Sequence, residues 1–274
     1  MPIHPKRTRS TIAAKASRRP LILLTNDDGF YSPGIRALAE SLDDLGQVWI
    51  VAPDRERSGT SLSITLHHPL RVKKTGDRVY AVDGTPADCV YMAVQKILPR
   101  KPDILVSGIN SGPNLGQQDI SYSGTMAGAL QGTFLRIPSL ALSLMSGASG
   151  KFDYPFAARL ARKFAARILE SPPNEGVTLN VNIPPPPVKG IRLVSLGEKR
   201  YNPEIVIKTD PRGRTYYWIG TGNPRAVGGE GTDVRVIKKG YVTVTPVHRD
   251  LTAHQSLEDG RLKRTIEGID DEMA

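Results

Sequence analysis

Cysteine is nearly absent from this chain. Cys89 is the single cysteine in 274 residues, so no internal disulfide can form. That scarcity fits a reducing compartment. Because Cys89 stands in an apolar helical stretch, we expect a buried small hydrophobe rather than a reactive thiol. No uninterrupted apolar run approaches the ~20 residues that cross a bilayer, so no membrane partner is expected.

Acidic residues are missing from residues 1–20, which carry six of the ten net positive charges of the chain. The same stretch has little hydrophobic periodicity, so we predict a basic, disordered extension. A targeting peptide and a nucleic-acid contact are alternatives, although the segment lacks the apolar core of a secretory signal. The rest of the chain is only mildly basic, which suits an anionic small substrate.

Aromatic residues are also few, at 6% of the chain. A stacking platform or a recognised motif for nucleic acid is not visible, so a nucleic-acid-binding protein is the weaker alternative. Hydrophobic residues make up 39% and charged residues 23%, which indicates a packed core. The length suits one large α/β domain, with or without an appendage.

Apolar strands alternate with amphipathic helices through the first two thirds of the chain. Strands are predicted at 21–24, 48–52, 102–108, 139–144 and 177–183, helices at 33–42, 86–98, 125–134 and 152–169, a hairpin within 62–83 and a polar loop at 109–124. Strand–helix–strand order implies right-handed crossovers and parallel pairing. We therefore predict a three-layer, Rossmann-like α/β fold, with a mostly parallel sheet flanked by helices.

The pattern changes after the proline run at 184–187. Short strand-like runs and many glycines follow, with little helix, which predicts a β-rich excursion. The predicted organisation is a basic extension at 1–20, a catalytic domain at 21–190, a β-rich C-terminal arm at 191–257 and a charged tail at 258–274. An arm that packs on a partner subunit and a small second lobe both fit this pattern.

Two adjacent carboxylates, Asp27 and Asp28, follow the apolar run 21–24. Two acids at this place contribute little to packing, and they repel each other. A hard cation that neutralises both carboxylates is the simplest reason for the fold to tolerate this repulsion. Ligands of an open parallel sheet bind beyond the carboxyl ends of its strands. We therefore expect a cation at this end of the first strand.

Two further polar loops should reach the same edge, at 53–60 and 107–116. These loops offer oxygen ligands but no histidine or cysteine, which favours Mg²⁺, Mn²⁺ or Ca²⁺ over zinc. The pair His67 and His68 is expected at the surface. Glycines in 107–116 and the helix start near Ser123 are typical of a phosphate cradle. A divalent ion beside an anion site suits phosphoryl transfer.

Six segments together resemble the SurE family of metal-dependent 5′/3′-nucleotidases. They are Ile22–Phe30, Val51–Gly59, Gly84–Val90, Ser107–Gly116, Tyr122–Thr125 and Gly240–Pro246. The resemblance covers about residues 21–255. It implies one Mg²⁺ or Mn²⁺ per subunit, held by Asp27, Asp28, Ser58 and Asn110. It also implies hydrolysis of nucleoside 5′- and 3′-monophosphates, activity of some members on short polyphosphate, a cytoplasmic location, and a homodimer or homotetramer that exchanges the C-terminal arm.

The chain departs from the family pattern in four places. One extra residue precedes Tyr122, which leaves the position of Asp119 open, and Met126 and Gln131 replace the common valine and glutamate. The basic extension lies outside the pattern.

The predicted catalytic residues are Asp27 and Asp28, and Asp28 is the better choice to orient or deprotonate an attacking water. Substrate contacts are predicted for Ser58, Gly59, Asn110, Asn114, Ser123, Gly124 and Thr125. Direct attack by a carboxylate is the alternative, but neither aspartate has an acid two positions later. A nucleotide sensor without catalytic activity would use overlapping residues.

Overall fold

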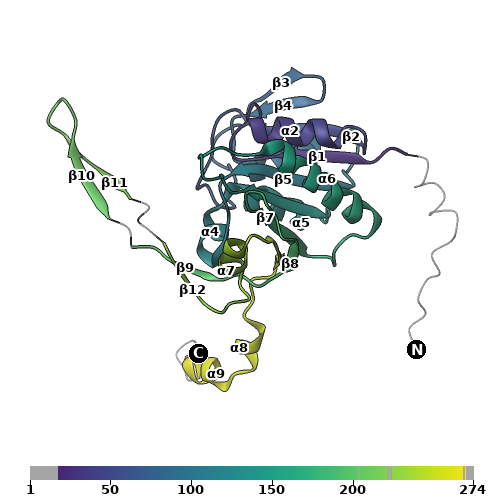
Figure 1. Ribbon diagram of the computed structural model, residues 1–274. Helices are drawn as coiled ribbons and strands as arrows, with labels where there is room; N and C mark the ends of the chain where they lie inside the picture. Colours follow the sequence, from purple (N-terminus) through teal and green to yellow (C-terminus); the bar gives the residue numbers. More distant parts are fainter. Residues whose placement is uncertain (1–17, 203, 221, 223, 268, 270–274) are drawn as a thin grey trace, which may run out of the picture.

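The computed structural model describes residues 18–202, 204–220, 222, 224–267 and 269. Most of the predicted basic extension and the end of the predicted charged tail lie outside these ranges. The described chain forms a nine-stranded sheet with helices on both faces, from which a long hairpin and a C-terminal helical segment project (Figure 1). Within these residues, no helix has the length and apolarity required to cross a membrane.

The centre of the sheet consists of parallel strands, as the sequence predicts. The strand order is β3-β4-β2-β1-β5-β6-β7-β13-β8, in which β13 (Val242–His248) and β8 (Ile191–Leu193) come from the C-terminal third of the chain. The bounds are β1 (Leu21–Thr25), β2 (Gln47–Pro53), β3 (Val72–Gly76), β4 (Val79–Val82), β5 (Ile104–Ser111), β6 (Ser139–Leu144) and β7 (Val177–Ile183). β1 pairs in parallel with β2 and β5, whereas β3 and β4 form the predicted antiparallel hairpin. The carboxyl ends of the central strands therefore meet at one edge.

Two helical layers cover the sheet. The helices are α2 (Pro33–Leu42), α3 (Pro86–Met92), which continues as a π-helical turn η1 (Ala93–Ile97), α5 (Gly124–Phe134) and α6 (Tyr154–Glu170). α2 and α6 pack on one face with Ile22 and Leu24, and α3 and α5 pack on the other with Leu23. This alternation of β1 side chains between the two faces is that of a strand buried on both sides. Cys89 lies buried in the second core, where burial raises the pKa of its thiol.

Local caps explain where two of these helices begin. The Ser32 hydroxyl accepts from the amide of Ile35, and Pro33 occupies the first turn of α2. Thr85 and Asp88 form a reciprocal capping box at the start of α3. Both starts were visible in the sequence because each needs only neighbouring residues.

The loop predicted at 109–124 is partly wrong. β5 continues to Ser111, and the segment Gly116–Tyr122 forms a short helix, α4. The amide of Gly116 donates to the Asp233 carboxylate, 2.8 Å away, and the amide of Gln117 donates to the carbonyl of Gly197. These partners come from far along the chain, so the local pattern could not reveal the helix.

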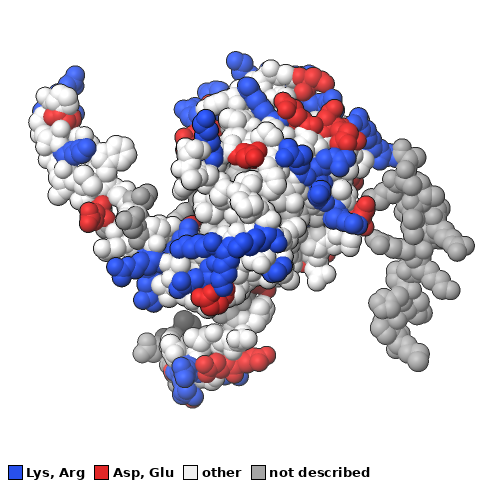
Figure 2. Space-filling view, viewed as in Figure 1, with Lys and Arg blue, Asp and Glu red and all other residues white. Residues whose placement is uncertain are grey.

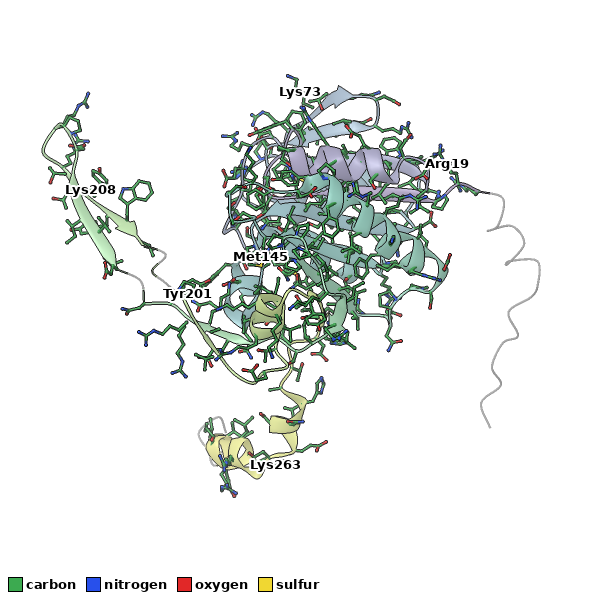
Figure 3. The ribbon with its side chains drawn as sticks, viewed as in Figure 1. Arg19, Lys73, Met145, Tyr201, Lys208 and Lys263 are labelled. Atoms are coloured by element: carbon green, nitrogen blue, oxygen red, sulfur yellow. The ribbon has the colours of Figure 1, made fainter. Side chains whose placement is uncertain are left out.

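The C-terminal third contains the expected short strands. Its elements are β8 (Ile191–Leu193), β9 (Glu198–Arg200), β10 (Ile205–Thr209), β11 (Thr215–Ile219), β12 (Arg225–Val227), α7 (Asp233–Val236), a 3-10 turn η2 (Ile237–Lys239), β13 (Val242–His248), α8 (His254–Glu258) and α9 (Gly260–Ile266). β13 returns to the main sheet antiparallel to β7, and β8 pairs beside it. The hairpin β10–β11 extends away from the body, with Lys208 far out and Tyr201 at the junction (Figure 3).

Candidate active site

A polar cleft opens at the carboxyl edge of the parallel strands. Its cavity volume is about 560 Å³. It is lined by Asp27, Asp28, Glu56, Ser58, Gly59, Asn110, Ser111, Pro113, Asn114, Asp119, Tyr122 and Ser123. The structure thus brings together the three loops that follow β1, β2 and β5. Of the nine predicted site residues, all except Gly124 and Thr125 line this cleft.

The acidic turn after β1 is held by the side chain of Asn26. The amide nitrogen of Asn26 donates to the carbonyl of Gly29 and to the hydroxyl of Ser32, at 3.0 and 2.8 Å. The amide of Gly29 donates back to the Asn26 oxygen. Gly29 has a φ of 101°, a left-handed conformation that favours glycine. The turn therefore fixes the two aspartates between β1 and α2.

Asp27 is buried at the floor of the cleft. One of its carboxylate oxygens accepts a hydrogen bond from the Thr125 hydroxyl, at 2.6 Å. Burial raises the pKa of Asp27, and the bond from Thr125 acts in the opposite direction. Thr125 is itself fully buried, so its hydroxyl serves Asp27 rather than the open cleft.

Asp28 lies in surroundings that oppose its negative charge. Burial and the neighbouring Asp27 carboxylate raise the pKa of Asp28 to about 6, and Glu56 adds to the repulsion. The Oδ2 atom of Asp28 is buried and has no hydrogen-bond partner within the described residues. A buried carboxylate oxygen without a hydrogen-bond partner is costly in free energy. A bound cation would both supply a partner for this oxygen and offset the repulsion between the carboxylates.

Ser58 and Asn110 supply neutral oxygens from the two other loops. The Ser58 hydroxyl donates to the Glu56 carboxylate, 2.9 Å away, and its oxygen stays exposed. The side-chain nitrogen of Asn110 donates to the carbonyl of Gly112 at 2.8 Å, and the residue lines the cleft. The amide of Arg57 donates to the carbonyl of Asp27, so the Ser58 loop is tied to the acidic turn.

Asn114 is a buried, rigid part of the cleft wall. Its side-chain nitrogen donates to the Ser143 hydroxyl at 2.8 Å, and its backbone amide donates to the Asn182 side chain. Its carbonyl accepts from the side chains of Asn180 and Asn182. The polar ends of β6 and β7 thus hold the loop after β5 in place.

The start of α5 closes the cleft beside Asp27. The Ser123 hydroxyl caps this helix by accepting from the amide of Met126, 3.1 Å away. Gly124 packs so closely that an added Cβ would lie 2.7 Å from the Cβ of Asp27. A helix N-terminus and a carboxylate pair therefore meet at one point, which suits an anion that is also bound by a cation.

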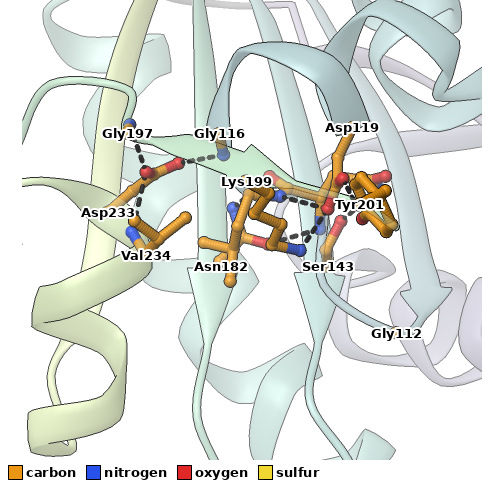
Figure 4. A network of polar contacts seen from close by, with 12 residues as sticks. Gly112, Gly116, Asp119, Ser143, Asn182, Gly197, Lys199, Tyr201, Asp233 and Val234 are labelled. Atoms are coloured by element: carbon orange, nitrogen blue, oxygen red, sulfur yellow. Dashed lines mark hydrogen bonds and ion pairs between the residues drawn. The ribbon is translucent and has the colours of Figure 1, made fainter. Parts of the chain in front are cut away.

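The wall formed by α4, which directly precedes α5, is anchored by the C-terminal arm. Asp119 of α4 pairs with Lys199 of β9 and accepts from the hydroxyl of Tyr201, and Asp233 accepts from the amides of Gly116 and Gly197 (Figure 4). Burial and Asp119 raise the pKa of the Tyr201 phenol. The C-terminal arm therefore supports the wall of the cleft through its contacts with α4.

Five lining residues were not among the predicted site residues. They are Glu56, Ser111, Pro113, Asp119 and Tyr122. Asp119 and Tyr122 are three apart, so they share a face of α4. That spacing was present in the sequence, but it had meaning only once the segment was known to be helical.

The donor set fits a hard divalent ion. No group of three histidine, cysteine or acidic side chains suited to a metal occurs within the described residues. The cleft instead combines two carboxylates with hydroxyl and amide oxygens, which is the chemistry of Mg²⁺ or Mn²⁺ rather than zinc. His67 and His68 are exposed and do not line the cleft, as expected.

The sheet, its two helical layers and this edge cleft define a Rossmann-like α/β protein. Residues 22–203 match the family model described as Survival protein SurE. The chain belongs to the SurE family. A protein named 5′-nucleotidase SurE from Geotalea daltonii is 48% identical over 239 residues, which are 86% of this chain and 96% of that protein.

A second relative of the same name, from Geobacter metallireducens, is 49% identical over 243 residues, covering 86% of this chain and 94% of that one. The crystal structure of the SurE protein from Aquifex aeolicus superposes with a TM-score of 0.74 at 41% identity. It covers 88% of this chain and 100% of that one. The fold predicted from the sequence is thereby confirmed.

Proposed function

We propose that this chain is a divalent-metal-dependent phosphomonoesterase that converts nucleoside 5′-monophosphates to nucleoside and phosphate. The main support for this proposal is the pair Asp27 and Asp28 in the cleft. Both carboxyl groups have raised pKa values, and the buried Oδ2 atom of Asp28 has no hydrogen-bond partner within the described residues. Relatives at 48–49% identity bear the name 5′-nucleotidase. A cleft of about 560 Å³ leaves room for a nucleotide.

Asp27, Asp28, Ser58 and Asn110 would hold the ion, one per subunit. When bound, Mg²⁺ or Mn²⁺ supplies neutralisation of phosphoryl charge and acidification of water. Thr125 keeps the Asp27 carboxylate in one orientation through its 2.6 Å hydrogen bond. The choice between Mg²⁺ and Mn²⁺ is left to experiment.

In this proposal, the residues around the start of α5 bind the phosphate group of the substrate. Ser123 and Asn114 line the cleft, and the helix N-terminus at Gly124 favours negative charge. Gly59 and Ser58 face the same space from the loop after β2. Thr125 acts here through Asp27 and not by contact with the phosphate.

Water is the nucleophile in this proposal, and Asp28 orients it. Asp28 is the more exposed of the two aspartates, whereas Asp27 is fixed on the floor of the cleft. The positions two residues after each aspartate are Gly29 and Phe30, so the acid spacing of aspartyl-phosphate enzymes is not present. A phosphoaspartate trapped on either residue would contradict this step.

The proposal extends to 3′-monophosphates and short polyphosphate. An open cleft edge imposes no visible constraint on which ribose carbon carries the phosphate. Arg200 of β9 and Arg225 of β12 are exposed and lie opposite each other in the strand register, next to Lys199. Figure 2 shows basic side chains around the base of the arm. A longer polyanion bound in the cleft would pass close to these charges.

We also propose a homodimer or homotetramer formed through the arm. One face of the hairpin β10–β11 carries Ile205, Ile207, Tyr217 and Ile219, each between 54% and 78% exposed. A contiguous apolar face of this kind typically marks a protein interface. The cytoplasmic location stays a prediction that rests on the family resemblance, and the lone cysteine fits a reducing compartment.

The test is a phosphate-release panel. Full-length protein is assayed with 5′- and 3′-nucleotides and short polyphosphate, each with Mg²⁺, Mn²⁺, Ca²⁺ or EDTA. We expect release from nucleotides with Mg²⁺ or Mn²⁺ and none with EDTA. Nucleotide binding without release under excess metal would instead indicate a sensor. A salt-dependent DNA shift without hydrolysis would support the nucleic-acid alternative.

A further inference from the structure

Tyr122 stands out on the cleft wall. It is the last residue of α4, its side chain is 58% exposed, and it precedes the capping residue Ser123. Within the described part of the chain it is the one aromatic residue that lines the cleft. An exposed ring at the mouth of a polar cavity has a hydrophobic cost unless a ligand covers it.

The backbone that carries this ring is held at both ends. The carbonyl of Tyr122 accepts from the amide of Ser61, at 3.1 Å, and the Ser61 hydroxyl donates to the carbonyl of Ser121 at 2.7 Å. At the other end of α4, the amide of Gly116 bonds to Asp233 and Asp119 bonds to Lys199. The ring is therefore presented on a fixed support, which lowers the ordering cost of binding a flat ligand.

The position of Tyr122 next to the residues proposed to bind phosphate indicates which kind of ligand its ring would contact. Tyr122 is next to Ser123 in sequence, and both line the same cleft as Asp28 and Asn110. The exposed Tyr122 ring lies beside this phosphate-binding position. A group esterified to a phosphate at Ser123 would therefore lie within reach of the aromatic ring.

We propose that Tyr122 is the stacking platform for the nucleobase of the substrate. This inference rests on the proposed nucleotidase function and assigns the leaving nucleoside to the α4 wall. Stacking on an aromatic ring tolerates every base because each base has a π face. The platform therefore favours nucleotides over other phosphomonoesters without selecting one base.

The experiment compares two substrates that share a phosphate and a ribose, AMP and ribose 5-phosphate, with Mn²⁺ present. The variants are Tyr122→Leu, which keeps apolar bulk, and Tyr122→Phe, which keeps the ring. Tyr91→Leu is the matched control, because Tyr91 is 46% exposed on α3 and outside the cleft. Circular dichroism verifies that each variant is folded.

We expect Tyr122→Leu to raise the KM for AMP at least tenfold more than the KM for ribose 5-phosphate, with kcat changed much less. Tyr122→Phe should restore the KM for AMP to within about threefold of the parent protein, and Tyr91→Leu should change neither substrate. UMP and GMP should respond to Tyr122→Leu as AMP does.

Equal effects of Tyr122→Leu on both substrates, or no effect on either, would overturn the assignment. So would a Tyr122→Leu variant that changes its sedimentation coefficient, because the ring would then contact a second copy of the chain. Failure of the proposed function has a different signature, since the parent protein would then release no phosphate from any nucleotide.

Discussion

The Thr125 hydroxyl donates a 2.6 Å hydrogen bond to the Asp27 carboxylate, although the two residues are 98 positions apart. The bond joins the first turn of α5 to the acidic turn after β1, at the cleft floor. It fixes one carboxylate oxygen of Asp27 and leaves the other for a different partner. Thr125, which the motif predicts as a phosphate contact, is buried and bonds to this carboxylate, so we expect it to position Asp27.

Replacing Thr125 tests this relationship. Thr125→Val keeps the shape but removes the donor, so we expect metal affinity and kcat/KM to fall about 10–100-fold, as for other residues that orient a ligand. Thr125→Ser keeps a hydroxyl and should retain most of both. Calorimetric titration with Mn²⁺ measures affinity independently of turnover. Equal Mn²⁺ affinity in Thr125→Val and the parent protein would contradict the positioning role.

Gly124 offers a steric test of the same contact. An added Cβ would lie 2.7 Å from the Asp27 Cβ and 3.1 Å from its carboxyl carbon, so Gly124→Ala must displace Asp27 or α5. We expect at least a tenfold loss of kcat/KM and a loss of about 1–3 kcal/mol in the free energy of unfolding. Gly229→Ala is the matched control, because nothing lies within 4 Å of its added Cβ. Normal turnover by Gly124→Ala would show that the close approach is not needed.

The sequence predicted much of the fold because most of its signals are local. Ser32 and Thr85 mark helix starts through residues three positions away, and β1 is an unbroken apolar run. α4 escaped prediction because its supports, Asp233 and Lys199, come from the arm. The cleft-lining role of Tyr122 was missed for the same reason.

The proposed metal ligands could be named from the motif, but the electrostatic surroundings of their side chains could not. The raised pKa of Asp28 depends on burial and on Asp27 and Glu56, which the fold brings close. The commitment of Thr125 to Asp27 likewise needs the packing of α5 against β1. Residue type therefore indicates which oxygen atoms are offered at the cleft, and the tertiary structure determines their electrostatic surroundings.

The stability of the metal-free protein should fall as the pH rises. The folded pKa of Asp28 is about 6, above its ordinary 3.8, and burial also raises that of Asp27. The folded state then binds more protons than the unfolded chain between about pH 4 and 6, so unfolding becomes easier across this window. We expect a loss of roughly 1–2 kcal/mol, because the partly exposed Asp28 is screened by water.

Urea denaturation in EDTA from pH 4.5 to 7.5 measures this slope, with Asp28→Asn as the control that should flatten it. Adding Mn²⁺ at pH 7.5 should restore the stability of the parent protein but not that of Asp28→Asn. A parent protein whose stability rises through this window would show that the two carboxylates are not repelling each other.

A charged substitution on the apolar face of the hairpin β10–β11 tests the proposed oligomer. Ile207→Asp places a charge in the middle of the apolar face, whereas Lys163→Asp reverses the charge of an exposed residue on α6, away from the hairpin. We expect sedimentation velocity to show that Ile207→Asp shifts the parent oligomer to monomer, and that Lys163→Asp does not. A parent protein that sediments as a monomer would refute the proposal directly.

The most direct measurement for the central claim is an anomalous difference map from crystals soaked in Mn²⁺. The account predicts one strong peak per chain, at roughly 2.0–2.3 Å from oxygens of Asp27, Asp28, Ser58 and Asn110. A map without a peak there, with the Asp28 Oδ2 atom bonded to a protein donor instead, would contradict it.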